Sequence, residues 1–317
     1  MRVARIVLVS AAAIAAPASA DAPVVGGAPA QLGAWPDAVA VIGETGTCSG
    51  TLVAPDVVLT AGHCADIGPQ RIIVGTVNYA LGGVAVDVAA TIAHPDSATS
   101  YDVAALALAT PVPGIAPGAL GTACTFGDFA AGTPVELVGF GLTNDAATGT
   151  NTQLNAASTV VTDPTCTGDE GCRPSIAPGG EFAAGGDGID TCNGDSGGPV
   201  YLATPRGEVV VGVVSRGTSG AHSPCGDGGI YVRTDKIAAW LDEVAGPVTL
   251  DSCAGIAAAA TPDSERSDDA IGGCSSTARG SRLDAIVIVL ALAFVRRVRR
   301  RRPSVGHARP SVGRNAR

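Results

Sequence analysis

The segment Gly188–Val200 reads GIDTCNGDSGGPV and decides how the rest of the sequence is interpreted. Its thirteen residues include two aspartates, a cysteine, a serine and four glycines. Because glycine tolerates backbone angles that other residues avoid, the simplest interpretation is a turn held by a disulfide. That interpretation gives no reason for Asp195, which stands beside Ser196 and between glycines. The segment therefore calls for a chemical explanation.

The hydroxyl of Ser196 points to nucleophilic chemistry if a base is available elsewhere in the chain. A serine hydroxyl is a weak nucleophile unless a base removes its proton, and the oxyanion that then forms needs hydrogen-bond donors. Among four histidines, His63 stands out because it lies in VLTAGHC beside Cys64. The other three lie before a proline, in a polar loop and in a basic tail: His94, His222 and His307. We predict that His63 is the base.

Composition favours an all-β protein. The chain of 317 residues is 46% hydrophobic but only 3% aromatic, and its 43 Gly and 21 Pro are typical of short strands joined by many turns. Antiparallel strands are predicted for five apolar stretches: DAVAVIG, GTLVAPDVVLT, RIIVGTVNYA, PVELVGFG and EVVVGVVSRG. One helix is predicted in TDKIAAWLDEV, with Thr234 or Asp235 as its cap. Its apolar face would hold Ile237, Trp240, Leu241 and Val244.

Three segments, in this order, resemble the His, Asp and Ser segments of the chymotrypsin/trypsin family of serine endopeptidases: CSGTLVAPDVVLTAGHC, SYDVAALAL and DTCNGDSGGPV. The similarity covers about residues 24–244. It implies a protease domain over 24–246 with two antiparallel Greek-key β-barrels, about 24–125 and 126–234, and a helix at 235–244. It also implies hydrolysis of peptide bonds through an acyl-enzyme, with no cofactor.

The same resemblance assigns roles within the three segments. It implies that His63 acts as general base and then acid, that Asp102 orients its imidazole, and that Ser196 attacks the substrate carbonyl. Backbone N–H groups of Gly194 and Ser196 would form the oxyanion hole. Two nearby carboxylates, Asp87 and Asp96, remain alternatives to Asp102. Neither of them begins the apolar strand DVAALAL, which starts at Asp102.

A further implication concerns activation. Resemblance implies that Asp195 pairs, buried, with the ammonium of a new N-terminus, and VVGGAPAQLGAWP resembles the family's mature start at Val24. A buried carboxylate without such a partner is costly. The residue before Val24 is Pro23, not Arg or Lys, so we expect another protease to remove residues 21–23.

Substrate selection is assigned in the same way. The family's specificity residue stands six positions before the nucleophile, which is Asp190 here, and an aspartate there implies cleavage after Arg or Lys. The alternative is a loop aspartate facing solvent. Gly217 and Gly229 would form pocket walls, and Ser215 would help to pair the substrate backbone. Arg216 replaces the family's usual tryptophan, so the neighbouring subsites are left open.

The resemblance also implies pairings for eight of the nine cysteines: Cys48 with Cys64, Cys192 with Cys225, Cys166 with Cys172, and Cys124 with Cys253. Nine is odd, and Cys274 is left over. Disulfides persist in oxidising compartments. Residues 1–20 carry Arg2 and Arg5, an apolar run and a small-residue end, which is the pattern of a secretory signal. We expect an exported protein, extracellular or at the cell surface.

The C-terminal part differs in composition. Residues 247–282 are predicted to be a flexible linker. Residues 283–302 combine a short apolar run with an arginine cluster, and residues 303–317 are a basic tail. With Cys274 ahead of them, they resemble the MYXO-CTERM sorting signals of exported myxobacterial proteins. The implication is transient membrane or cell-surface attachment, and the alternative is that Cys274 is an ordinary thiol.

Charge narrows the partners. Residues 24–278 hold 27 Asp plus Glu against seven Lys plus Arg, and such a surface repels nucleic acid and attracts basic partners. We expect a monomer that acts on protein or peptide substrates, basic ones above all. No zinc spacing or acidic calcium pair is evident in the sequence, so no metal is expected. The rival hypothesis is a binding or adhesion module that uses the same fold without catalysis.

Overall fold

In the computed structural model, residues 24–168, 171–173 and 179–252 are described, and the structural statements below refer to them. All described residues lie in one compact unit of the chain. The predicted signal segment, the residues before Val24, and everything from Cys253 onward lie outside the described residues. The predicted linker, arginine cluster and Cys274 are therefore not described.

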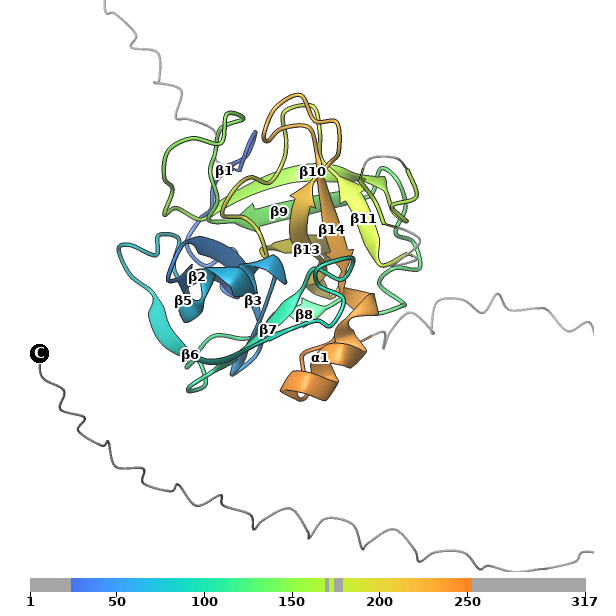
Figure 1. Ribbon diagram of the computed structural model, residues 1–317. Coiled ribbons are helices and arrows are strands. Elements are labelled where there is room, and N and C mark those ends of the chain that lie inside the picture. Colours follow the sequence, from blue (N-terminus) through green and yellow to red (C-terminus); the bar gives the residue numbers. More distant parts are fainter. Residues whose placement is uncertain (1–23, 169–170, 174–178, 253–317) are drawn as a thin grey trace, which may run out of the picture. The chain divides into compact units, whose positions relative to one another are not determined.

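The first half of the domain forms a closed barrel of six strands in the order β2-β3-β4-β7-β6-β5, and every neighbouring pair is antiparallel (Figure 1). The strands are β2 (Ala38–Gly43), β3 (Thr47–Ala54), β4 (Val57–Thr60), β5 (Pro69–Val74), β6 (Val84–Ala93) and β7 (Ala104–Leu108). A 3-10 helix, η1 (His63–Ile67), follows β4.

The second half forms another six-stranded antiparallel barrel, which the pairing of β9 with β10 closes. Its strands are β9 (Pro134–Gly139), β10 (Asn155–Asp163), β11 (Glu181–Ala184), β12 (Pro199–Thr204), β13 (Gly207–Gly217) and β14 (Gly229–Arg233). The predicted all-β class with two barrels is confirmed. The five predicted strand stretches are confirmed as well, since β2, β3 with β4, β5, β9 and β13 lie within them or overlap them.

The division between the barrels differs from the predicted one at two short strands. β1 (Ala28–Pro29) pairs with β10, and β8 (Ala119–Leu120) pairs in parallel with β13. Both lie within residues 24–125 and yet both belong to the second sheet. The sequence motifs did not indicate this, because strands of two residues carry no periodic pattern.

Side chains that point alternately to the two faces of the strands form three apolar clusters. On β2, Val39 and Val41 face the interior of the first barrel, whereas Ala38 and Ala40 face a cluster that lies between the barrels. On β9, Val135 and Leu137 face the interior of the second barrel. Because successive side chains of a strand point to opposite faces, each barrel fills its own core and also packs against the other.

The C-terminal helix is shorter than predicted and begins differently. A 3-10 turn, η2 (Thr234–Lys236), precedes α1 (Ala238–Ala245), and neither has a side-chain cap, so the predicted cap at Thr234 or Asp235 is wrong. Thr234 Oγ1 donates to the Val210 carbonyl at 2.8 Å, and Asp235 pairs with Arg233. Both side chains are thus engaged elsewhere. The predicted apolar face is confirmed and packs on the cluster between the barrels.

No helix among the described residues combines the length and apolar character that a membrane span requires.

Candidate active site

His63 is the first residue of η1, directly after the end of β4 and the turn Ala61-Gly62. A disulfide joins the next residue, Cys64, to Cys48 on β3. The His63 ring is held by Asp102, because its Nδ1 lies 2.8 Å from Asp102 Oδ2. The backbone N–H of His63 donates to Asp102 Oδ1, also at 2.8 Å. The histidine is 46% exposed, so its other ring nitrogen can face a ligand.

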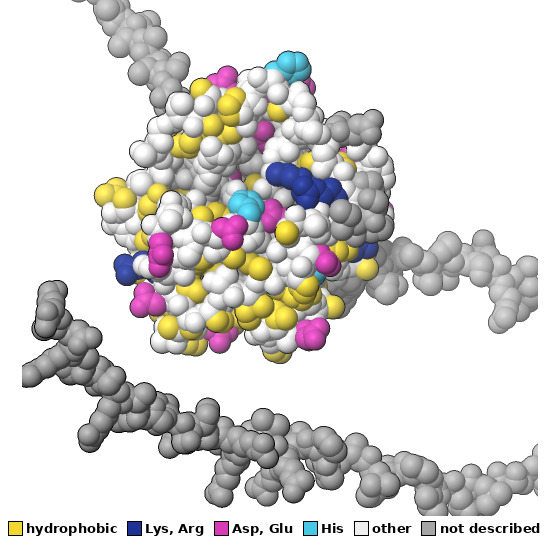
Figure 2. Space-filling view, viewed as in Figure 1, with side chains coloured by type: hydrophobic (Ala, Val, Ile, Leu, Met, Phe, Trp, Pro, Cys, Tyr) yellow, Lys and Arg dark blue, Asp and Glu magenta, His cyan; other side chains and the backbone are white. Residues whose placement is uncertain are grey.

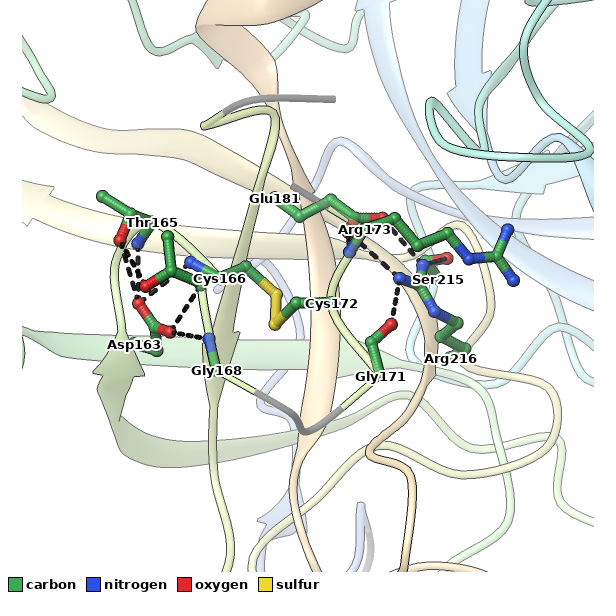
Figure 3. Close-up of a disulfide and its surroundings, with 11 residues drawn as sticks. Asp163, Thr165, Cys166, Gly168, Gly171, Cys172, Arg173, Glu181, Ser215 and Arg216 are labelled. Atoms are coloured by element: carbon green, nitrogen blue, oxygen red, sulfur yellow. Dashed lines mark hydrogen bonds and ion pairs between the residues drawn. A yellow bond between two sulfur atoms is a disulfide. The ribbon is translucent and has the colours of Figure 1, made fainter. Parts of the chain in front are cut away.

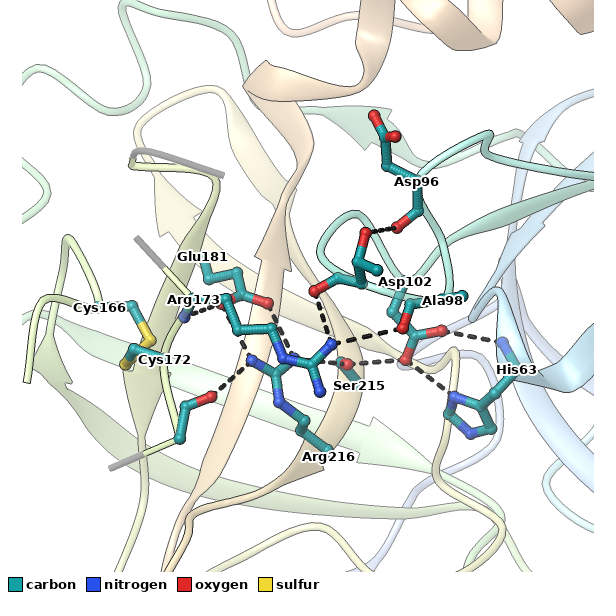
Figure 4. A network of polar contacts seen from close by, with 12 residues as sticks. His63, Asp96, Ala98, Asp102, Cys166, Cys172, Arg173, Glu181, Ser215 and Arg216 are labelled. Carbon is teal, nitrogen blue, oxygen red and sulfur yellow. Dashed lines mark hydrogen bonds and ion pairs between the residues drawn. A yellow bond between two sulfur atoms is a disulfide. The ribbon is translucent and has the colours of Figure 1, made fainter. Parts of the chain in front are cut away.

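Asp102 lies in the loop between β6 and β7 and is only 13% exposed. A third donor reaches it, because Ser215 Oγ lies 2.7 Å from Oδ2 (Figure 4). Burial alone would raise the pKa of Asp102, but the hydrogen bonds and charge of His63 and the bond from Ser215 outweigh it and lower that pKa. The hydrogen bond to Asp102 in turn raises the pKa of His63, against the opposing effect of burial.

Ser196 is held against the same elements. Its carbonyl oxygen accepts the N–H of Ser49 on β3 at 2.9 Å and lies 3.6 Å from Cys64 Sγ. The next residue, Gly197, donates its N–H to the carbonyl of Val214 on β13 at 2.8 Å. The structure therefore brings the loop of Ser196 next to η1, which carries His63, and to the end of β13.

Gly194, predicted to supply an oxyanion donor, has a φ of 99°, in the left-handed region that favours glycine. Its carbonyl accepts the Ser49 hydroxyl at 2.8 Å, and the same hydroxyl accepts the N–H of Phe140 at 3.0 Å. Ser49 is buried and thus links the first barrel to two segments of the second. Sequence reasoning missed Ser49, because its position beside Cys48 gives no signal of contacts with residues so distant in sequence.

Asp195 is fully buried, and backbone N–H groups bind both of its oxygens. Gly141 N donates to Oδ1 at 2.7 Å and Cys192 N to Oδ2 at 2.9 Å. Burial raises the pKa of this carboxyl to about 7, although the two hydrogen bonds lower it, and the charge of Asp190 adds to the rise. The predicted partner, Val24, is also buried and packs in the core of the second barrel. Here Val24 is joined to Pro23 by a peptide bond and carries no free amine.

Asp190 is buried and not solvent-facing, unlike the alternative considered from the sequence. Three backbone N–H groups bind its carboxylate: Thr191 at 2.7 Å, Gly226 at 3.0 Å and Gly228 at 3.2 Å. Burial raises the pKa of Asp190, and these hydrogen bonds oppose the rise. A carboxylate held in this way can receive a cation from a ligand.

The two predicted wall residues are the last residue of β13, Gly217, and the first residue of β14, Gly229. Gly217 pairs with Gly229 across β13 and β14. A side chain at Gly229 would come within 3.2 Å of Asp190 Oδ1, whereas Gly217 faces open space. The disulfide of Cys192 with Cys225 joins the two loops around the carboxylate. A side chain at Gly229 would also meet the Tyr231 hydroxyl at 2.6 Å, so glycine keeps this position beside Asp190 free of a side chain.

Arg216 has a partner that the sequence did not indicate. Its Nη1 lies 2.8 Å from Oε1 of Glu181 and its Nη2 lies 3.0 Å from Oε2, which is a two-point contact (Figure 3). Nη2 also donates to the Gly171 carbonyl at 2.8 Å. Glu181 is only 2% exposed at its side chain and Arg216 is 25% exposed. The cation beside the pocket is therefore paired.

A second arginine joins this network. Arg173 donates its backbone N–H to Glu181 Oε2 at 3.1 Å, and its Nη1 donates to the carbonyls of Thr99 at 2.6 Å and Ala98 at 3.5 Å (Figure 4). The disulfide of Cys166 with Cys172 closes the loop that leads to Arg173. Sequence reasoning missed Glu181 and Arg173, because neither lies in a motif.

Two of the remaining predicted cysteines lie outside the described residues. Cys124 is disulfide-bonded, but Cys253 lies outside the described residues, so their pairing stays a prediction. Cys274 also lies outside. Among the described residues, one group has possible metal-ligand atoms that all lie within 4.8 Å of one another, namely Cys48, His63 and Cys64. Its two sulfurs form a disulfide and therefore offer no thiolate to a metal.

Comparison with known proteins agrees with the fold. Residues 24–241 match the model of the family described as Trypsin. Serine protease 56 of Mus musculus is 34% identical over 306 residues, which are 90% of this chain and 50% of that protein. The chain thus spans about half the length of that relative. A protein named Trypsin from Saccharopolyspora erythraea is 34% identical over 66% of this chain and 92% of its own length.

A third relative is Chymotrypsin-like elastase family member 1 of Canis lupus familiaris, which is 30% identical over 71% of this chain and 93% of its own length. The family match spans both barrels and the segments that carry His63, Asp102 and Ser196. With two closed antiparallel barrels and a family match over most of its length, the chain belongs to the trypsin family.

Proposed function

We propose that this protein is a serine endopeptidase that hydrolyses peptide bonds through His63, Asp102 and Ser196. The observation that carries the proposal is the pair of 2.8 Å hydrogen bonds from the ring and the backbone of His63 to Asp102. They leave the other ring nitrogen of the exposed histidine available, on the side chain that lies next to the loop of Ser196. Membership of the trypsin family supports the same chemistry.

Acylation begins when Ser196 Oγ attacks the carbonyl carbon of the scissile peptide bond and His63 Nε2 takes the hydroxyl proton. The resulting tetrahedral oxyanion accepts hydrogen bonds from the N–H groups of Gly194 and Ser196. The intermediate then collapses, the C–N bond breaks, and the leaving amine takes the proton from His63. Asp102 stabilises the imidazolium formed between these steps.

Deacylation repeats the cycle with water as the nucleophile. His63 Nε2 removes a proton from the water as it attacks the acyl carbon, and it returns the proton to Ser196 Oγ as the ester bond breaks. The products are a free carboxylic acid and the restored serine. The raised pKa of His63 favours the steps in which it accepts a proton, because a stronger base accepts the proton more readily.

For substrate choice, we propose cleavage after Arg or Lys. The buried, hydrogen-bonded carboxylate of Asp190 supports this choice, because burying an Arg or Lys side chain requires a paired anion. The paired residues Gly217 and Gly229 carry no side chains that could obstruct its approach, and Gly217 faces open space.

Activation is proposed to follow removal of residues 21–23. A free ammonium at Val24 would give the buried carboxylate of Asp195 a counter-charge, whereas in the uncleaved chain that carboxylate has backbone N–H groups and a pKa near 7. The proposed export to the extracellular space or cell surface is supported by the disulfides of the domain. The proposed attachment through the tail rests on sequence alone.

A fluorophosphonate probe tests the proposed chemistry directly, because it reacts with an activated serine. The protein beginning at Val24 should be labelled on Ser196 and should hydrolyse arginyl peptides. Ser196→Ala should abolish labelling and lower kcat/KM by several orders of magnitude, about 10⁴-fold or more. Ser158→Ala, which removes an exposed hydroxyl outside the cleft, is the matched control. Equal labelling of the Ser196→Ala variant would place the activated serine elsewhere and exclude this mechanism. Absence of labelling in the unmodified protein would favour a binding module.

A further inference from the structure

A free strand edge lies beside the loop of Ser196. The bonds between β13 and the β12 segment end with Val214, whose N–H donates to the Gly198 carbonyl at 3.0 Å. On its other edge β13 continues to pair with β14, through Arg216 with Ile230 and Gly217 with Gly229. Residues 215–217 therefore have no strand on the first edge among the described residues. An extended peptide can add there as a further antiparallel strand.

The direction of such a peptide follows from the pairing. β12 runs antiparallel to β13, and the loop of Ser196 precedes β12. A substrate that continues this antiparallel edge has its scissile bond at Ser196 and its preceding residues along Ser215–Gly217. Those upstream residues then lie beside the side chains that surround Arg216.

The two carboxylates nearest this edge already have partners, since Asp102 binds His63 and the Ser215 hydroxyl and Glu181 binds Arg216. Glu181 carries one negative charge and is matched by Arg216, whose two terminal nitrogens are occupied by Glu181 and by neutral groups, the Gly171 carbonyl and the Ser215 hydroxyl. Arg173 adds a second positive charge. Its side chain contacts only the carbonyls of Thr99 and Ala98 among the described residues. Of the two guanidinium groups, only that of Arg173 has no carboxylate partner among the described residues.

Arg173 is unusual among the basic residues of the domain. Residues 24–252 contain six Lys or Arg, and five of them have a carboxylate within 4.0 Å. Arg173 has none within the described part of the chain, and Asp169 and Glu170, which precede it, lie outside that part. A guanidinium group has five N–H donors. The contacts described for Arg173 use Nη1, so Nε and Nη2 can bind a ligand.

The position of this charge is visible on the surface. Figure 2 shows a group of Lys or Arg side chains near a histidine in the middle of the viewed face, with acidic side chains next to that histidine and also elsewhere on the face. Figure 4 shows Arg173 and Arg216 together, between Glu181 and the pair of His63 and Asp102. The unpaired charge of Arg173 thus lies beside the substrate edge of a domain that is strongly acidic as a whole.

We propose that Arg173 forms a cationic subsite that selects an Asp or Glu side chain two to four residues before the scissile bond. Arg216 is a positioning residue, because its pairing with Glu181 holds the strand edge in place. The same Glu181 accepts the backbone N–H of Arg173 and so also holds the backbone of the arginine that faces the peptide. This subsite rests on the proposed peptidase function and narrows its substrates to those with an acidic residue upstream of the cleaved bond.

Matched peptides measure this selection. The probes are blocked tetrapeptides that release a fluorophore after arginine and carry Asp or Asn, and Glu or Gln, at each upstream position in turn. We expect kcat/KM for the acidic peptide to exceed that of its amide isostere about 2- to 5-fold at one or more positions, as for an exposed ion pair. The ratio should fall toward one in about 1 M salt. A ratio of one at all positions overturns the proposal.

Three variants assign the effect to Arg173. Arg173→Gln should bring the acid-to-amide ratio close to one, whereas Arg173→Lys, which keeps the charge, should keep most of it. Arg71→Gln removes an exposed arginine that lies in the first barrel, away from the substrate edge, and should leave the acid-to-amide ratio unchanged. A ratio that survives Arg173→Gln, or that falls equally with Arg71→Gln, overturns the proposal.

Binding separates this subsite from the proposed activity. The affinities of the same peptide pairs for the Ser196→Ala protein, measured by fluorescence anisotropy, give the acid-to-amide ratio without turnover. Absence of hydrolysis in the unmodified protein would contradict the peptidase function alone. An acid-to-amide ratio of affinities that exceeds one and depends on Arg173 would still support the subsite. A ratio of one, or a ratio that Arg173→Gln leaves unchanged, would overturn the subsite.

Discussion

His63 and Asp102 are joined at two points, since the carboxylate accepts the imidazole N–H through one oxygen and the backbone N–H of the same histidine through the other, each at 2.8 Å. The backbone bond fixes the carboxylate relative to η1 whatever the ring does. The ring bond then decides which imidazole nitrogen carries the proton. Removing the charge of Asp102 should therefore disturb the proton and leave the fold in place.

We expect Asp102→Asn to lower kcat by about 10⁴-fold, the magnitude known for this change in a trypsin-family enzyme. The amide would donate to His63 Nδ1, so the proton would sit on Nε2 and that nitrogen could no longer accept the serine proton. Steady-state kinetics with an arginyl peptide measures the loss. Asp96→Asn is the control, because Asp96 is exposed in the same loop. A larger loss from Asp96→Asn would move the role to that residue.

The pH profile should follow His63, whose neutral form is the base. Because the bond to Asp102 raises its pKa above 6.5, kcat/KM should fall as the pH decreases through a value above 6.5. Loss of that bond removes the main cause of the rise, so the residual activity of Asp102→Asn should persist to lower pH than that of the unmodified enzyme. An acid limb at the same pH in both proteins would show that another group controls the profile.

We expect Asp190→Ser to reduce kcat/KM for arginyl peptides by about 10²- to 10³-fold, because an Arg side chain would be buried without its anion. Arginyl and phenylalanyl peptides compared on both proteins give the result. Asp187→Asn is the control, since Asp187 is exposed and its φ of 54° is one that asparagine tolerates. A preference of the unmodified enzyme for Phe or Leu would reject the assignment of Asp190.

Stability should depend on pH through Asp195 while Val24 has no free amine. The pKa of this carboxyl is about 7 in the folded chain and 3.8 in its ordinary state. The protonated carboxyl of Asp195 therefore stabilises the folded chain fully below about pH 4, and this stabilisation is lost as the pH rises toward 7. The resulting change in the free energy of unfolding is roughly 4 kcal/mol. A free Val24 ammonium favours the charged carboxylate and removes that loss.

Urea unfolding of Ser196→Ala proteins measures this difference. The chain that begins at Val24 should be more stable at about pH 8 than the chain that retains the residues before it, and the gap should narrow at about pH 5. Asp195→Asn should flatten the pH dependence of the longer chain. If both chains respond equally to pH, Asp195 and Val24 do not act as a pair.

The location of the protein should depend on Cys274. Export should pause where the apolar run at 285–294 meets six arginines, because moving these charges across hydrocarbon is unfavourable. The run is short for a stable span, so the attachment should be temporary unless processing near Cys274 replaces it. Cys274→Ser should change the distribution between cell fractions without changing specific activity. Equal distributions with the tail intact in both proteins would leave Cys274 as an ordinary thiol.

The sequence predicted the barrels and the motif residues but not the contacts between motifs. Alternating strands and the GDSGG segment are local patterns, so the fold class and the buried Asp190 and Asp195 could be anticipated. The pairing of Arg216 with Glu181 could not, because it joins two strands and depends on side-chain geometry. The predicted cap of the helix failed for a related reason, since Thr234 binds the carbonyl of Val210 on a neighbouring strand.

The first residues of the domain are held by strands that are synthesised much later. Ala28 pairs with Ala156, and Val25 pairs with Asp190, which stands in the second half of the chain. Contacts so distant in sequence form late and slow the folding of a chain. A ribosome or a secretion channel that has released only the first barrel thus carries a histidine and an aspartate without their serine. The three residues of the proposed triad can therefore come together only after the whole domain has emerged.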